Sequence, residues 1–219
     1  MILCIGDVLN SKELDEICSK VAELTFVDGR ATAGWSARLV KDNEQAEGSK
    51  QVEIVLRRLA ERILANELFQ LAVRPKRLTP LLISRYGEGK QYGTHVDDAL
   101  MQGMRTDVSF TLFLADPDSY VGGELIIETS AGEQPFKLPA GSMVVYPSTT
   151  LHRVAPVESG LRVAAVGWAR SYVRTAENRE ILFDLETARR DLFEREGKTS
   201  AFDLLSKCSA NLLRLWVDD

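Results

Sequence analysis

The segment between Arg77 and Arg170 constrains the fold most, because it is a series of short β-rich runs separated by turn signals. DVSFTLFL and ELIIET are rich in β-branched, apolar and aromatic residues, which favour strands. Turn-forming residues lie between the runs, at Asp116-Pro117-Asp118, Gly122-Gly123, Ala131-Gly132, Pro139-Ala140-Gly141 and Ser159-Gly160. About seven or eight short strands at this spacing predict a β-sandwich or jelly roll.

Helical patterns flank the β-rich block on both sides. Apolar residues recur at helical spacing over four segments, 11–24, 50–66, 177–196 and 201–217. Residues 27–48 carry three glycines and many polar groups, and we expect strand pieces and loops there. We expect the last two helices to pack against the sheet of their own chain, with a dimer contact as the alternative.

The chain is therefore expected to be an α+β protein in three parts. Residues 1–75 form an N-terminal helical and strand support, residues 76–170 the β-rich core, and residues 171–219 a C-terminal helical extension. A double-stranded β-helix is the form of jelly roll that brings the first and last strands of such a core together.

Charge and cysteine content exclude several classes. The net charge is −5, so no basic field predicts nucleic acid or an anionic membrane as a partner. The start, MILCIGDVLNSKELDE, lacks the features of a signal peptide, and no apolar run reaches the roughly 18 residues of a membrane span. Three cysteines without metal spacing predict reduced thiols and a cytoplasmic protein.

The chain has only two histidines, and both fall where one metal site requires them. His95 and Asp97 are two residues apart, so on an extended segment they project to the same face. His152 follows from a later strand. Two histidines and one carboxylate form the facial triad that binds non-haem Fe(II) and leaves positions open for substrate and O2. A lone His-x-Asp is more often a turn histidine beside an acidic loop, but the joint pattern is far more specific.

Arg162 lies ten residues after His152, within the otherwise apolar LRVAAV. A guanidinium forms bidentate, charge-assisted bonds with carboxylates, so Arg162 is the candidate for the distal carboxylate of 2-oxoglutarate. The alternative is an arginine on a solvated face. Tyr86 is a second candidate for this carboxylate. Tyr92 is another, although packing of its ring near the site explains it equally well.

These motifs resemble those of a known family. The segment from Arg85-Tyr86 to His95-Val96-Asp97 resembles the tyrosine-plus-HxD segment of prolyl 4-hydroxylase-like Fe(II)/2-oxoglutarate dioxygenases, over residues 77–190. The resemblance is most specific to the bacterial PKHD-type hydroxylases, in the segments Arg105–Leu114, Tyr120–Leu125, Pro139–Ser148, Leu151–Val154, Arg162–Ala164, Trp168–Arg174 and Leu182–Leu185.

The resemblance implies a double-stranded β-helix, with Fe(II) at His95, Asp97 and His152 and 2-oxoglutarate at Arg162. It implies a hydroxylase that uses O2, decarboxylates 2-oxoglutarate to succinate and CO2, and uses L-ascorbate as a reductant. The implied substrate is a peptidyl prolyl or other amino-acid side chain. Many relatives have Arg-x-Ser where this chain has Arg162-Val163-Ala164, so Tyr86 is expected to replace the lost hydroxyl. The intact Asp97 argues against a halogenase.

Three alternatives remain open. A non-catalytic sensor would bind iron and 2-oxoglutarate without turnover. A cupin-like metal-binding module would be expected to spread more histidines over its strands. A pure interaction protein would leave the His, Asp and Arg pattern unexplained. We also expect the loop Asp98–Arg105, with Met101 and Met104, to be a substrate-facing lid rather than an ordinary connector.

Overall fold

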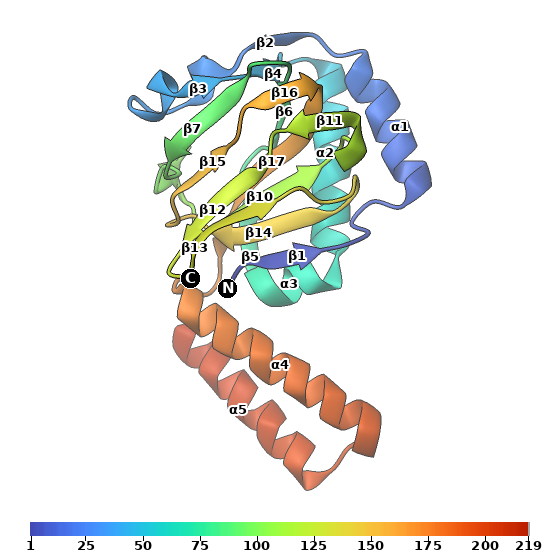
Figure 1. Cartoon of the computed structure of the whole chain (residues 1–219). Helices are drawn as coiled ribbons and strands as arrows, with labels where there is room; N and C mark the ends of the chain where they lie inside the picture. Colours follow the sequence, from blue (N-terminus) through green and yellow to red (C-terminus); the bar gives the residue numbers. More distant parts are fainter. Residues whose placement is uncertain (219) are drawn as a thin grey trace.

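Two antiparallel sheets form the body of the protein, which we describe for residues 1–218 of a computed structural model (Figure 1). The larger sheet has eight strands in the order β1-β14-β10-β17-β6-β4-β2, with β5 also paired to β17. Their bounds are Leu3–Ile5, Met143–Pro147, Val108–Phe113, Arg162–Ser171, Leu82–Tyr86, Glu44–Ala46, Phe26–Asp28 and, for β5, Pro75–Leu78.

The smaller sheet has the order β13-β12-β15-β7-β3. Its strands are Gly132–Phe136, Leu125–Thr129, His152–Val154, Gln91–His95 and Lys41–Asp42. Two short pairs complete the strands, β8 (Leu100–Met101) with β9 (Met104–Arg105) and β11 (Tyr120–Gly122) with β16 (Val157–Gly160). Apart from the short pairs and the β12–β13 hairpin, successive strands from β6 to β17 alternate between the two main sheets, which is the pattern of a double-stranded β-helix. The predicted α+β jelly-roll class is confirmed.

The N-terminal segment joins both sheets rather than standing apart. β4 pairs with β6 in the larger sheet, and β3 pairs with β7 in the smaller one. The short 3-10 turns Gly29–Thr32 and Ala37–Leu39 lie between β2 and β3. Residues 27–48 are thus strand pieces and loops, as predicted, and they run from one sheet to the other next to the first ligand strand.

Three helices cover the outer face of the larger sheet (Figure 1). α1 (Ser11–Ala22) begins at Asn10, whose side chain accepts a bond from the Glu13 amide in a capping box. α2 (Lys50–Ala65) follows. α3 (Glu67–Val73) was missed in the prediction, because Asn66 both ends α2 and caps α3. Phe69 of α3 meets Phe110 of β10 edge to face at 5.5 Å, so helix and sheet share one apolar core.

The C-terminal helices form a hairpin that extends away from the sheets (Figure 1). α4 (Ala176–Glu196) packs against α3 and α5 (Ser200–Trp216), and its buried residues all lie in its first three turns. α5 buries no residue. The prediction that both helices pack on the sheet is therefore wrong for α5, because α1 to α3 already cover that face. Among residues 1–218, no helix has the length and apolar character needed to cross a bilayer.

Candidate metal and co-substrate site

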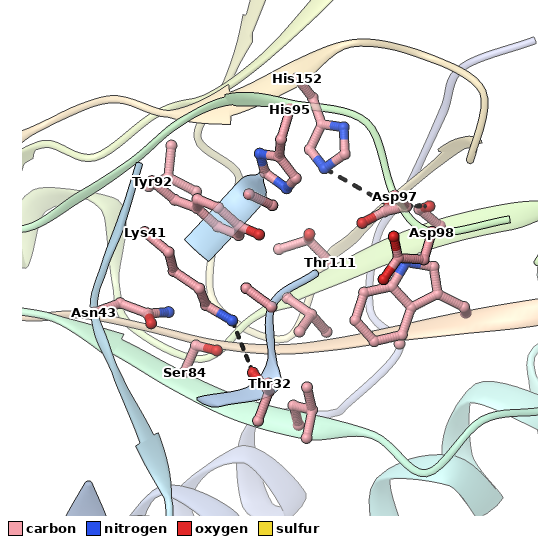
Figure 2. A pocket seen from close by; sticks show the side chains of 18 of the residues that line it. Thr32, Lys41, Asn43, Ser84, Tyr92, His95, Asp97, Asp98, Thr111 and His152 are labelled. Atoms are coloured by element: carbon pink, nitrogen blue, oxygen red, sulfur yellow. Dashed lines mark hydrogen bonds and ion pairs between the residues drawn. The ribbon is translucent and has the colours of Figure 1, made fainter. Parts of the chain in front are cut away.

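The two histidines and Asp97 meet at one end of the smaller sheet. His95 ends β7 and lies directly opposite His152, which begins β15. Their ring centroids are 4.3 Å apart, and His152 Nε2 lies 3.7 Å from Asp97 Oδ2. One potential ligand atom from each of the three residues lies within 4.8 Å of the others. Figure 2 shows the three side chains turned toward a common centre.

Hydrogen bonds behind these side chains fix their chemistry. Nδ1 of His95 donates to the Gly93 carbonyl at 2.9 Å, and Nδ1 of His152 donates to the Thr150 carbonyl at 3.0 Å. A carbonyl only accepts, so each ring carries its proton on Nδ1 and leaves the Nε2 lone pair free for a metal. The Ser109 hydroxyl donates to Asp97 Oδ2 at 2.6 Å and orients the carboxylate.

Aromatic rings enclose the histidines. Tyr92 stacks on His95 with ring centroids 3.7 Å apart, and the Tyr146 ring lies 5.1 Å from His152. Burial, with the neighbouring His152, lowers the pKa of His95 to about 4, so its ring is neutral at pH 7. Tyr92 was considered either as a ligand of the 2-oxoglutarate carboxylate or as a ring that packs near the site. Its stacking on His95 supports the second of these explanations.

Arg162 is the first residue of β17 and pairs across the strands with Tyr86 of β6. It is only 1% exposed, so the alternative of a solvated arginine is wrong. Its guanidinium carbon lies 5.1 Å from the Tyr86 ring centroid and 5.5 Å from that of Phe113. Within residues 1–218, no carboxylate pairs with it and its Nε has no hydrogen-bond partner. A buried, unpaired guanidinium is costly, and a bound carboxylate would remove this cost.

The Gly122-Gly123 turn makes room for this arginine. Gly123 has a φ of +69°, a conformation that favours glycine, and an added Cβ would lie 3.0 Å from Arg162 Cδ. The sequence identified Gly122-Gly123 only as a turn. Its contact with the arginine was not predicted, because Gly123, just after β11, and Arg162, at the start of β17, come together only in the folded chain.

A cavity of about 380 Å³ connects the triad with Arg162. Its wall also includes Lys41, Asn43 and Gln45, three N-terminal residues that sequence reasoning missed. Of the expected lid, Met101 lines the cavity, whereas Met104 is buried and does not line it. The segment expected to be a lid contains the β8–β9 hairpin, whose tight turn has positive φ at Gln102 and Gly103.

Comparisons with known proteins agree with this geometry. Residues 81–170 match the family model of the 2OG-Fe(II) oxygenase superfamily. A PKHD-type hydroxylase of Synechococcus sp. (strain JA-2-3B'a(2-13)) is 56% identical over 227 residues, covering 100% of both chains. The PKHD-type hydroxylase SYNPCC7002_A2658 of Picosynechococcus sp. (strain ATCC 27264 / PCC 7002 / PR-6) is 52% identical over 219 residues, again covering 100% of both.

Solved structures share the fold at lower identity. A prolyl-4-hydroxylase of Pseudomonas putida superposes with a TM-score of 0.55 at 20% identity, covering 78% of this chain and 92% of that one. The 2OG complex of the viral collagen prolyl hydroxylase from Paramecium Bursaria Chlorella virus-1 gives a TM-score of 0.52 at 18% identity, covering 78% and 95%.

Proposed function

The chain belongs to the PKHD-type hydroxylases of the 2OG-Fe(II) oxygenase superfamily, and on this premise we propose that His95, Asp97 and His152 bind Fe(II) while Arg162 binds the distal carboxylate of 2-oxoglutarate. The protein is an Fe(II)- and 2-oxoglutarate-dependent hydroxylase. The observation that carries the residue assignment is Arg162, a buried guanidinium without a carboxylate partner in residues 1–218, in the same cavity as the triad.

The donor set fits Fe(II), since neutral imidazole suits iron and one carboxylate offsets part of its charge. Bound iron would supply the redox chemistry that couples O2 and 2-oxoglutarate decarboxylation, yielding succinate and CO2, to substrate hydroxylation. The protein's part is positional. The two backbone carbonyls hold the imidazole rings, and Ser109 holds Asp97. Arg162, beside the Tyr86 ring, fixes the far end of the co-substrate.

The proposed substrate is a prolyl or other amino-acid side chain, on analogy with the two solved prolyl hydroxylases described above. L-ascorbate as a reductant is a further part of the proposal. A non-catalytic sensor and a cupin-like metal module are the competing assignments. Both would bind metal without releasing succinate, so product formation separates them from the hydroxylase.

The experiment is a turnover assay with labelled co-substrate. Wild-type protein is supplied with Fe(II), O2 and 2-oxoglutarate labelled at C1. It is expected to release labelled CO2 and unlabelled succinate in equal amounts, with L-ascorbate sustaining the rate. Asp97→Ala should bind less iron and release neither. Thr94→Ala, a change at an exposed residue of the same strand, is the control and should keep the activity. Full turnover by Asp97→Ala would refute the assignment of the ligands.

The proposal also concerns the oligomeric state and the location of the protein. We propose a homodimer formed through the α4–α5 hairpin, supported by the exposed Leu204 and Leu215 on α5. Light scattering should give a molecular mass of two chains for the wild type and of one chain for Leu215→Glu. We also propose a cytoplasmic location, supported by three cysteines that are all free thiols.

A further inference from the structure

A second cation, Lys41, lies in the cavity beside the triad. It begins β3, pairs with Tyr92 at the edge of the smaller sheet, and is only 5% exposed. Its ammonium lies 5.1 Å from the Tyr92 ring centroid, and Tyr92 in turn stacks on His95. The cation is therefore adjacent to the centre where the reaction is proposed to take place. Figure 2 shows its side chain extended into the pocket toward Thr32.

Neutral groups hold this ammonium in place. Lys41 Nζ donates to Thr32 Oγ1 at 2.8 Å, and the Thr32 hydroxyl donates to Gln45 Oε1 at 2.7 Å. Gln45 in turn contacts Ser84 of the larger sheet. No carboxylate of residues 1–218 forms an ion pair with Lys41. An ammonium has three donors, so two remain for a ligand.

Asn43 provides an independent polar group in the same wall. It is 2% exposed and lines the cavity, and its amide forms no hydrogen bond of good geometry within residues 1–218, although the Tyr86 hydroxyl lies close enough to interact with it. A Cβ atom on residue 29 would lie only 2.1 Å from Asn43 Oδ1, which is a clash. Glycine at position 29 therefore leaves the space that the Asn43 side chain occupies. Buried amides are normally fully hydrogen-bonded, and the one Tyr86 hydroxyl can satisfy only one atom of this amide, so the other is available to a ligand.

Charge matching indicates what this ligand is. With the proposed site filled, the charges of Fe(II) and Arg162 are balanced by Asp97 and the two carboxylates of 2-oxoglutarate. Lys41 then keeps an unmatched positive charge. Asp97 is the carboxylate that acts most strongly on Lys41, but in the filled site its charge is taken up by the iron. Asp28, which also acts on Lys41, and Asp98, which lines the cavity, are both exposed. A buried charge needs a partner, and here the substrate is the remaining source.

We propose that Lys41, together with Asn43, binds a carboxylate of the substrate and so selects an acidic substrate for hydroxylation. The inference rests on the proposed function, because it assumes that Arg162 and the triad are occupied by 2-oxoglutarate and metal. The carboxylate belongs either to the end of a peptide chain or to an acidic side chain. Neither Lys41 nor Asn43 takes part in the reaction; they position the substrate.

The experiment compares uncharged and charged probes of the same shape. The full-length protein, loaded with Zn(II) and 2-oxoglutarate so that no turnover occurs, is titrated with each probe by saturation-transfer NMR. One pair is N-acetyl-L-proline and its amide, which tests a chain-end carboxylate. The other is N-acetyl-L-glutamic acid α-amide and N-acetyl-L-glutaminamide, which tests a side-chain carboxylate.

In the wild type, the carboxylate of at least one pair is expected to bind about tenfold or more tightly than its amide, and that pair identifies the source. Lys41→Met should abolish the preference and Lys41→Arg should retain it. Lys76→Met is the matched control, since Lys76 also lies over a tyrosine ring, that of Tyr172, but does not line the cavity. Lys41→Met removes a buried charge at nearly constant volume, so the variant should fold.

Equal binding of acid and amide by the wild type, or no binding of either acid at millimolar concentration, would overturn the proposal. A preference that survives Lys41→Met would do the same. The thermal shift produced by 2-oxoglutarate keeps the two hypotheses apart. It should be unchanged in Lys41→Met, and its loss in this variant alone would reassign Lys41 to the co-substrate. Its absence from the wild type would instead contradict the proposed function.

Discussion

Replacing Arg162 with methionine should separate the stability of the protein from its co-substrate affinity. The guanidinium is 1% exposed, and within residues 1–218 it has no carboxylate partner and an unpaired Nε. Leaving a buried donor unpaired costs about 1–3 kcal/mol. Stacking over Tyr86 and Phe113 returns about 0.5–2 kcal/mol as cation–π interaction. Arg162→Met should therefore change the free energy of unfolding of the ligand-free protein by between a loss of about 1 and a gain of about 2.5 kcal/mol.

Co-substrate binding should change in the opposite direction. A bidentate guanidinium–carboxylate contact consists of two charge-assisted hydrogen bonds, each worth about 1.5–3 kcal/mol. Their loss, about 3–6 kcal/mol in total, raises the Kd of 2-oxoglutarate by a factor of about 10² to 10⁴. The thermal shift produced by 2-oxoglutarate in the wild type should then disappear in the variant at the same concentration.

The assay is thermal unfolding with Zn(II), with and without 2-oxoglutarate, and Arg105→Met is the matched control. Arg105 is also largely buried, but its Nε pairs with Asp107 Oδ1 at 2.7 Å. Breaking this pair should cost about 3 kcal/mol, and each kcal/mol lowers Tm by about 2–4 °C in a chain of this size. A similar drop in Tm for Arg162→Met without ligand would refute the reasoning, because it would mean that Arg162 is satisfied by the protein itself.

Three further predictions follow from the same contacts. Ser109→Ala removes the hydroxyl that orients Asp97 and should weaken Fe(II) binding about 10–100-fold, measured by anaerobic titration; an unchanged affinity would mean that the carboxylate needs no support. Gly123→Ala places a Cβ against Arg162 and should raise the Kd of 2-oxoglutarate more than that of the metal, measured by calorimetry; equal effects would exclude a specific action on the arginine. Burial lowers the pKa of Lys41 from 10.5 to about 8. Between about pH 8 and 10.5 the unfolded chain therefore binds more protons than the folded one, and the free energy of unfolding of the wild type rises with pH. Lys41→Met lacks the buried charge and should be more stable than the wild type at neutral pH, as measured by denaturant unfolding. This difference should shrink between about pH 8 and 10.5, and a constant difference would contradict the lowered pKa of Lys41.

Local sequence patterns predicted most of the elements. The four amphipathic helices and the β-rich runs of residues 77–170 were found because their periodicity is strong. α3 was missed because Asn66 both ends α2 and begins α3, and a seven-residue helix is too short for a clear periodic pattern of its own. The position of α5 was also missed, since a helical stripe indicates that a partner exists and does not identify it.

The proposed ligands were predictable because their spacing itself constrains geometry. His95 and Asp97 share a face at two residues' separation, and a single later histidine left no other choice. The N-terminal wall of the cavity was not predicted, although a signal was present. Lys41, Asn43 and Gln45 alternate with period two, which places polar side chains on one face of an extended segment. That pattern normally marks a solvated edge, and only the pairing of β3 with β7 turns it inward.

The most direct test of the site assignment is an anaerobic titration of the metal-free protein with Fe(II) and 2-oxoglutarate, monitored by visible absorption. The wild type should develop the weak charge-transfer band of 2-oxoglutarate chelated to iron. His152→Ala should show no band, and Arg162→Met should need about 10² to 10⁴ times more 2-oxoglutarate. Bound iron without a band in the wild type would contradict the assignment of this cavity to Fe(II) and 2-oxoglutarate.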